Sequence, residues 1–223
     1  DPGLAALFGS YDDEPADPGF VSQYKNLMHH YVHQRGSENA STFWSGCGAI
    51  WRELFLQFGG FSTRYARPSI EDIELGGALV QHGYRIRLDK SLQVKHLKRW
   101  TLLSLLRSDV FARGVPWARL ILRVGRMPND LNLQSSSRVS VALVYVGVLC
   151  SALGCLRPSL WLVMPIVALM LLGLNRDVYL FFMAKRGWAV ALGAVLMHWL
   201  YYFYGGLSFG LGLAWHYGEQ ITE

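Results

Sequence analysis

The sequence predicts a mixed α/β soluble part, followed by amphipathic interfacial helices and by three transmembrane helices. Three features support this prediction. Short apolar runs alternate with helical patterns before residue 100, a basic belt follows, and long uncharged runs occupy the C-terminal third. Alternating strand-like and helix-like segments are typical of α/β domains. Uncharged runs of about 18 residues are just long enough to cross a hydrocarbon core.

The soluble part, residues 1–100, is expected to hold short strands and helices ended by glycines. Strands are predicted over 4–10, 43–50 and 84–88, and helices over 21–34, 52–58 and 71–81. Ser69 is the expected N-cap of the last helix, and Gly83 ends it. The segment 84–88 alternates between polar and apolar residues, as an edge strand does.

Charge is distributed unevenly along the chain. Residues 1–94 carry 8 Lys or Arg and 11 Asp or Glu, whereas residues 95–138 carry 9 and 2. The basic belt therefore directly precedes about 80 largely apolar residues. This order argues against a nucleic-acid partner and favours anionic membrane lipids, which attract such belts at roughly 1 kcal/mol per basic residue.

The C-terminal third is predicted to span a membrane three times, over 139–156, 159–175 and 188–213 within a region covering 138–218. The alternative is that the two shorter runs are buried helices of a soluble protein. Basic residues flank the first span and occupy the segment 176–186, which is expected to be an interfacial loop. The positive-inside rule then places residues 1–138 in the cytoplasm, at a bacterial-type inner membrane, and the C-terminus outside.

Residues 101–137 are predicted to form amphipathic helices in the membrane interface. Leu102, Leu103, Leu106 and Val110 recur at helical spacing, and Arg119, Arg123 and Arg126 share one face that would meet lipid phosphates. A solvated surface helix is the alternative. Three cysteines, two of them in an apolar run, indicate no disulfide framework.

An acidic cluster is the strongest indication of chemistry. Glu71, Asp72 and Glu74 lie in the first turn of a predicted helix, where carboxylates also have a purely structural role at the positive end of the helix dipole. Upstream, Gly46-Cys47-Gly48 offers a backbone that another group can approach closely. Downstream, His96-Leu97-Lys98-Arg99-Trp100 joins basic and aromatic residues.

In this order and spacing, the chain resembles membrane-integrated family 2 glycosyltransferases of the GT-A fold. Phe43-Trp44-Ser45-Gly46-Cys47 is loosely similar to their acceptor-site strand Phe-Phe-Cys-Gly-Ser, and Glu71-Asp72 to the start of their catalytic helix. Residues 96–100 match the spacing of Gln-x-x-Arg-Trp, with His in place of Gln. The resemblance covers roughly residues 1–120 and implies a partial GT-A domain without its N-terminal donor-binding half.

The resemblance also implies roles for these residues. Asp72 would be the general base, with Glu71 shaping the site beside it. Gly46, Cys47, Gly48, Arg99 and Trp100 would bind substrates, Arg99 by offsetting charge on the leaving nucleoside diphosphate. His96 would be a ligand of a divalent metal, Mg²⁺ or Mn²⁺. The Asp-x-Asp metal motif of the family does not occur in this chain. For His96 and Arg99 the alternative is membership of the membrane-binding belt.

Two further histidine sets are weaker candidates. His29 and His33 lie one helical turn apart, a spacing used for zinc, but no third ligand accompanies them in the sequence. His198 lies within the third predicted span, where an ionisable residue either faces a polar path, such as that of a lipid-linked acceptor, or forms a helix–helix hydrogen bond.

The sequence therefore predicts a membrane-bound inverting glycosyltransferase. It would transfer sugar from a nucleoside-diphosphate sugar to a lipid-linked or glycan acceptor on the cytoplasmic face. We expect the chain to be part of a longer enzyme and inactive by itself. The alternative is a non-catalytic membrane anchor or glycan-export subunit, whose acids only cap a helix.

Overall fold

The computed structural model describes residues 3–65, 67–125, 127 and 131–222. The chain divides into two compact units. The first comprises Asp1–Asn132 together with Ser208–Glu223, and the second comprises Leu133–Leu207. Each unit is described by itself below.

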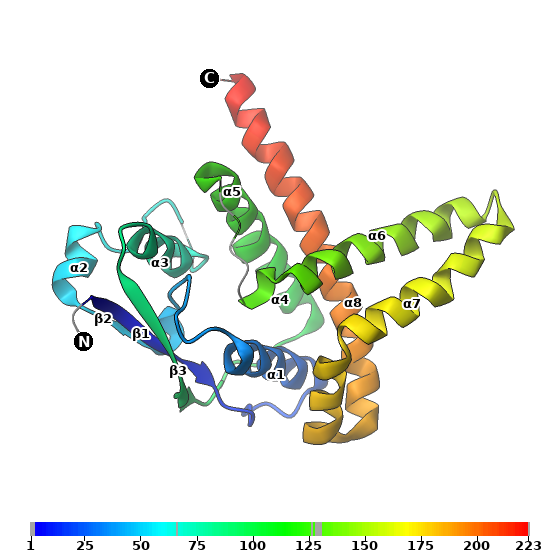
Figure 1. The fold of residues 1–223 in the computed structure, drawn as a ribbon, viewed down its shortest axis with the longest axis horizontal. Helices are drawn as coiled ribbons and strands as arrows, with labels where there is room; N and C mark the ends of the chain where they lie inside the picture. The colour runs from blue at the N-terminus through cyan, green and yellow to red at the C-terminus, as the bar shows by residue number, and fades with distance from the viewer. Residues whose placement is uncertain (1–2, 66, 126, 128–130, 223) are drawn as a thin grey trace. The chain divides into compact units, whose positions relative to one another are not determined.

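A three-stranded sheet organises the first unit. Its strands are β1 (Leu4–Tyr11), β2 (Gly48–Ile50) and β3 (Arg85–Val94), in the order β2-β1-β3 (Figure 1). Strand β1 pairs antiparallel with β2 and parallel with β3. Because β1 and β3 are parallel, their carboxyl ends lie at the same edge of the sheet, where ligands of open α/β sheets usually bind.

Strand β3 lies at an edge of this three-stranded sheet, as its alternating sequence suggested, and one isolated bridge covers part of its open side. The amide of Ala40 donates to the carbonyl of Ile86 at 2.9 Å, and the amide of Leu88 donates to the carbonyl of Glu38 at 2.8 Å. A short extended segment therefore pairs with the side of β3 that β1 does not cover. The alternation arises because Ile86 and Leu88 are buried in the core while the two arginines between and before them are exposed.

Helices α1 (Phe20–Arg35), α2 (Arg52–Gln57) and α3 (Glu71–Gln81) complete the soluble part, close to their predicted positions. Phe8, Leu79 and Leu88 are fully buried in one hydrophobic cluster. Gly76 lets α3 approach the chain at Phe43, since a Cβ at position 76 would lie 2.2 Å from the Phe43 amide nitrogen. The predicted cap is wrong: the N-cap of α3 is Ile70, and Ser69 donates its hydroxyl to the carbonyl of Ala112 at 2.5 Å instead.

The predicted strand over 43–50 is also shorter than expected. Ser45–Cys47 forms a single 3₁₀ turn, and only Gly48–Ile50 joins the sheet as β2. The Trp44 ring packs against this turn, so closely that a Cβ at Gly46 would come within 2.4 Å of it.

The basic belt folds into α4 (Leu102–Arg107), the π-helix η2 (Ser108–Gly114) and α5 (Val115–Val124), followed by the short turn η3 (Leu131–Leu133). Leu103 and Phe111 are 59% and 67% exposed, as expected for interfacial helices. The arginines behave differently from the prediction. Arg119 forms an ion pair with Glu219, and Arg123 lies 3.6 Å from Glu74. Each guanidinium group therefore already has a carboxylate partner within the chain. Arg126 lies outside the described residues.

The second unit is helical. It contains α6 (Ser135–Gly154), η4 (Pro158–Leu162), α7 (Val163–Leu174) and the first part of α8 (Arg176–Thr222), and Figure 1 shows α6 and α7 as a hairpin. Among the described residues two helices, Ser135–Gly154 and Arg176–Glu219, are long and apolar enough to span a membrane, and Pro158–Leu174 is shorter. The count of three spans is therefore not confirmed.

Helix α8 also replaces the predicted interfacial loop. Residues 176–186 are helical, and the break that separates them from the long apolar helix is Gly187, with φ 80° and ψ 174°. Glycine tolerates this positive φ without the strain that a side chain would add.

A polar network links the helices of the second unit. Asn175 donates to the Ser140 hydroxyl at 3.1 Å and accepts from the Tyr202 hydroxyl at 2.6 Å, all three being buried. Of the two alternatives for His198, neither is established. Its buried ring lies 4.4 Å from the Tyr202 ring, and the helix–helix hydrogen bond is made by Asn175 instead.

The C-terminal end of α8 packs against α5 in the first unit. Gly114 approaches Ser208 and Gly212 approaches Ala118, so closely that a Cβ on either glycine would meet the neighbouring side chain at 2.6 Å. One turn further on, Glu219 accepts a hydrogen bond from Arg119 and another, at 2.7 Å, from the Trp215 indole. The two segments run parallel and close together.

This packing predicts a C-terminus on the same side of the membrane as the soluble part, contrary to the three-span topology. A chain with Gly218→Cys as its single cysteine should therefore react with a membrane-impermeant maleimide in intact cells to the same extent as one whose single cysteine lies on the soluble part. Thr63→Cys, on the soluble part, is the matched reference. Labelling of position 218 but not of position 63 in intact cells would contradict the prediction.

Candidate functional site

The candidate site lies where β1 and β3 end. Tyr11 is the last residue of β1, and its ring contacts the ring of Trp44 at 4.7 Å and that of His96 at 4.2 Å between centroids. Three segments distant in sequence, the end of β1, the turn at 44–47 and the chain after β3, therefore meet at one edge of the sheet. This brings two of the predicted motifs together.

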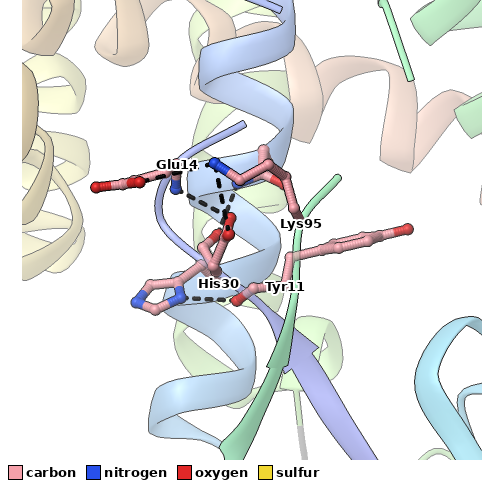
Figure 2. Close-up of polar contacts among 6 residues, drawn as sticks. Tyr11, Glu14, His30 and Lys95 are labelled. Atoms are coloured by element: carbon pink, nitrogen blue, oxygen red, sulfur yellow. Dashed lines mark hydrogen bonds and ion pairs between the residues drawn. The ribbon is translucent and has the colours of Figure 1, made fainter. Parts of the chain in front are cut away.

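The backbone of Tyr11 is held by contacts on the side away from its ring. Figure 2 shows the His30 imidazole meeting the Tyr11 carbonyl oxygen, at 2.8 Å, while the phenol ring extends away from it. In the loop that follows, Lys95 lies 3.7 Å from Glu14 and 4.0 Å from Asp12. Helix α1 and the chain after β3 thus contact the loop on both sides. The Tyr11 ring is not part of these contacts and lies in the candidate site.

Asp72 is held against the turn at Ser45. Its Oδ2 accepts hydrogen bonds from the amide and the hydroxyl of Ser45, both at 2.9 Å, and its Oδ1 accepts from the Ile73 amide at 2.8 Å. A carboxylate offers about four lone-pair positions. Three are used, so Asp72 can accept about one further hydrogen bond, from a group that approaches Oδ1.

The two neighbouring acids have partners of their own. Glu71 accepts a hydrogen bond from the Ser69 amide at 2.7 Å, which ties the start of α3 to the chain just before it. Glu74 pairs with Arg64 at 2.7 Å and with Arg123 at 3.6 Å. Two arginines therefore balance the charge of Glu74.

The glycines beside Cys47 serve packing in this structure. A Cβ on Gly48 would lie 2.7 Å from the Phe43 ring, much as one on Gly46 would meet Trp44. The groups that approach these two glycines closely are therefore the rings of Phe43 and Trp44. Cys47 is half-buried, and a role for this turn in substrate binding stays a prediction.

The motif at 96–100 divides into buried and exposed residues. Trp100 is only 6% exposed, and its amide donates to the Ser22 hydroxyl at 2.8 Å, so its indole is largely a core side chain. Lys98 lies over the Trp100 ring at 3.7 Å. Arg99 is exposed and, within the part of the chain that the structure describes, makes no hydrogen bond or ion pair.

A buried ion pair beside these residues was missed by the sequence analysis. Lys25 of α1 lies 2.7 and 2.8 Å from the two carboxylate oxygens of Asp109 in η2. Both side chains are almost fully buried, at 12% and 6% exposure. A signal existed, because Asp109 is one of only two acids in the basic belt. Only the fold reveals that its partner is a lysine 84 residues earlier.

Positive charges accumulate around this pair. Burial lowers the pKa of Lys25, and the charges of Arg113 and Lys98 lower it further, against the opposing effect of Asp109. Burial likewise lowers the pKa of Lys98, and Arg113 adds to the effect. Three cations therefore act on one another around a single carboxylate.

The nearby imidazoles respond in the same way. Burial, followed by the charges of Lys25 and Arg113, holds the pKa of His29 well below its ordinary value. The pKa of His96 is lowered by burial, then by Lys98 and the other two cations, and raised slightly by Asp12. Both rings are therefore neutral at pH 7, and they add no positive charge to the three cations.

The metal role predicted for His96, with its main ligands outside this chain, stays a prediction. The described residues contain no group of three His, Cys, Asp or Glu side chains placed to hold an ion. The His96 ring lies against Tyr11, and its buried Nδ1 has no partner among the described residues. The same finding gives no support for zinc at His29 and His33, whose rings are 6.0 Å apart.

Comparison with protein-family models, with curated protein sequences and with solved structures finds no match to this chain. The functional argument therefore depends on the geometry of the site.

The ion pair yields a stability prediction. Lys25→Met should destabilise the chain by about 3–5 kcal/mol, because Asp109 would remain charged and buried without a partner. The double variant Lys25→Met/Asp109→Leu should recover much of that loss, because no buried charge remains. Urea unfolding in detergent micelles measures both. A double variant no more stable than Lys25→Met would show that the pair is not the buried unit described here.

Proposed function

We propose that this chain belongs to a membrane-bound inverting glycosyltransferase of family 2 type. It would act on a nucleoside-diphosphate sugar and on a lipid-linked or glycan acceptor. The observation that supports this best is the Asp72 carboxylate, which Ser45 holds with about one acceptor position left.

The proposed chemistry is a single displacement. Asp72 accepts the proton of the acceptor hydroxyl, whose oxygen attacks the anomeric carbon of the donor sugar. The bond from that carbon to the diphosphate breaks, its electron pair goes to the phosphate oxygen, and the configuration inverts. A base must lie within about 3 Å of the hydroxyl that it deprotonates. A cation must offset the charge that develops on the leaving oxygen.

The sheet supports a partial GT-A domain. Strand β2 lies at its edge, and Gly48 and Ala49 are exposed there. Further strands can therefore extend the sheet on this side, as the proposed donor-binding half requires. A divalent metal, Mg²⁺ or Mn²⁺, remains part of the proposal through ligands outside this chain, and the described residues supply no step that passes through it.

Location at a bacterial-type inner membrane, with the soluble part in the cytoplasm, belongs to the same proposal. It is supported by two helices of spanning length and by the exposed apolar side chains of α4 and η2 beside basic residues.

A non-catalytic membrane subunit is the second candidate. It is favoured by the structural use of the acids, since Glu71 accepts a hydrogen bond from the Ser69 amide and Asp72 ties α3 to the Ser45 turn. A carboxylate that serves only the fold should be replaceable by an amide of the same shape. The two candidates therefore differ in what Asp72→Asn does.

We expect Asp72→Asn to lower sugar transfer by at least about 100-fold, as loss of a general base typically does. Transfer is measured with radiolabelled nucleoside-diphosphate sugars in membranes that contain the protein within its full-length enzyme. Ser45→Ala is the control, because it removes one of the hydrogen bonds to Asp72 but leaves the base. Its activity should fall less than that of Asp72→Asn.

If Asp72→Asn retains activity within tenfold of the parent, Asp72 is not the base. If no donor sugar is transferred by the parent, the subunit candidate is preferred.

A further inference from the structure

The side chain of Tyr11 reaches the candidate site from a well-held backbone position. Tyr11 ends β1 in register with Val94 of β3, and its carbonyl oxygen meets the His30 imidazole at 2.8 Å (Figure 2). From there its ring lies 4.2 Å from the His96 ring and 4.7 Å from the Trp44 ring, the latter edge to face at 71°. Aromatic pairs of this geometry attract each other beyond the area that they bury.

The Trp44 ring carries this contact to the turn at 45–47. The indole packs on the turn so closely that a Cβ at Gly46 would lie 2.4 Å from it. A second ring, that of His33, lies 5.2 Å from the indole and also packs edge to face. The indole is therefore in contact with two aromatic rings of the sheet and of α1 and with the backbone of the turn.

The turn orients the Asp72 carboxylate. The amide and the hydroxyl of Ser45 both donate to Oδ2 at 2.9 Å, and the Ile73 amide donates to Oδ1 at 2.8 Å. A displacement of Ser45 would remove two of these three hydrogen bonds. A misplacement of a catalytic group by about 1 Å can lower the rate by as much as about 100-fold.

We propose that Tyr11 is a positioning residue for Asp72, acting through Trp44 and Ser45. The aromatic ring of Tyr11, and not its hydroxyl group, holds the indole against the turn, and the turn holds the carboxylate. The sequence motifs gave Tyr11 no role. Its effect on sugar transfer rests on the proposed function, whereas its effect on the turn does not.

A packing role alone makes a different prediction. If Tyr11 served only to fill the edge of the core, loss of its ring would lower the stability of the whole unit without a selective effect on the turn. The two roles therefore differ in whether the Ser45 amide is affected more than the rest of the unit.

Hydrogen exchange of the Ser45 amide, followed by NMR on the full chain in detergent micelles, tests the link. Tyr11→Leu should accelerate this exchange about threefold to tenfold, the effect expected for loss of an aromatic pair. The reason is that the amide would separate from Asp72 more often. Tyr11→Phe keeps the ring and should stay within about twofold of the parent chain.

Tyr84→Leu is the matched control. Tyr84 directly precedes β3, at the opposite end of that strand from the candidate site, and its ring packs on Phe58 at 5.9 Å beside the hydrophobic cluster. This variant removes a ring of the same size from the same unit, so a general loss of stability would appear in both variants. Exchange at Ser45 should stay within about twofold of the parent chain in Tyr84→Leu.

Sugar transfer by the full-length enzyme in membranes is the second measurement. Tyr11→Leu should lower kcat, corrected for the amount of folded enzyme, about tenfold or more. The KM for the donor sugar should change less than about twofold, because Tyr11 acts on the base. Tyr11→Phe should restore most of kcat. A packing role alone would leave the corrected kcat unchanged.

The proposal is overturned if Tyr11→Leu leaves exchange at Ser45 within about twofold of the parent, or if Tyr84→Leu or Tyr11→Phe accelerates it equally. It is also overturned if Tyr11→Leu keeps the parent kcat while Asp72→Asn abolishes transfer. If Asp72→Asn retains transfer, the proposed function fails, and the exchange measurement alone then decides whether Tyr11 holds the turn.

Discussion

The ion pair between Lys25 and Asp109 is the contact on which the arrangement of the site depends. It joins α1, which packs beside the sheet, to η2, which belongs to the basic segment after β3. A buried pair of this kind contributes little net stability, because removing two charges from water costs about as much as their attraction returns. Its effect is on geometry, because any arrangement that separated the two side chains would leave a buried charge without a partner.

Two further contacts bring the same segment to the acid-bearing helix. Ser69 binds the carbonyl of Ala112, and Arg123 pairs with Glu74, so α3 is linked to η2 and α5 as well as to the Ser45 turn. In the first unit, α5 in turn packs on residues 208–219 of α8. The position of the Asp72 carboxylate therefore depends on segments that the sequence presents as membrane-associated.

The electrostatics of the site explain why neutral imidazoles and exposed cations lie together. Burial and the neighbouring cations both disfavour a charged His29 or His96. A region of positive potential next to aromatic rings suits a phosphate-bearing molecule whose sugar or chain contacts apolar surface.

Local pattern was sufficient for much of the fold. The helices over 20–35, 52–57 and 71–81 follow from helical spacing and from the glycines that end them, and Leu4–Tyr11 follows from an apolar run. The boundaries failed where tertiary contacts intervene. Residues 45–47 form a 3₁₀ turn on which the Trp44 ring packs, and Ser69 binds Ala112 instead of capping α3.

The sequence alone determined a mixed α/β part, a basic belt and long apolar helices, because composition and periodicity are local properties. It also identified Asp72 as a candidate, but not the Ser45 turn that holds it. Tertiary structure decided which cations meet at the site. Lys25 and Asp109 are 84 residues apart, and Arg113 rather than Arg99 joins them, because the fold and not sequence distance sets which charges are buried together.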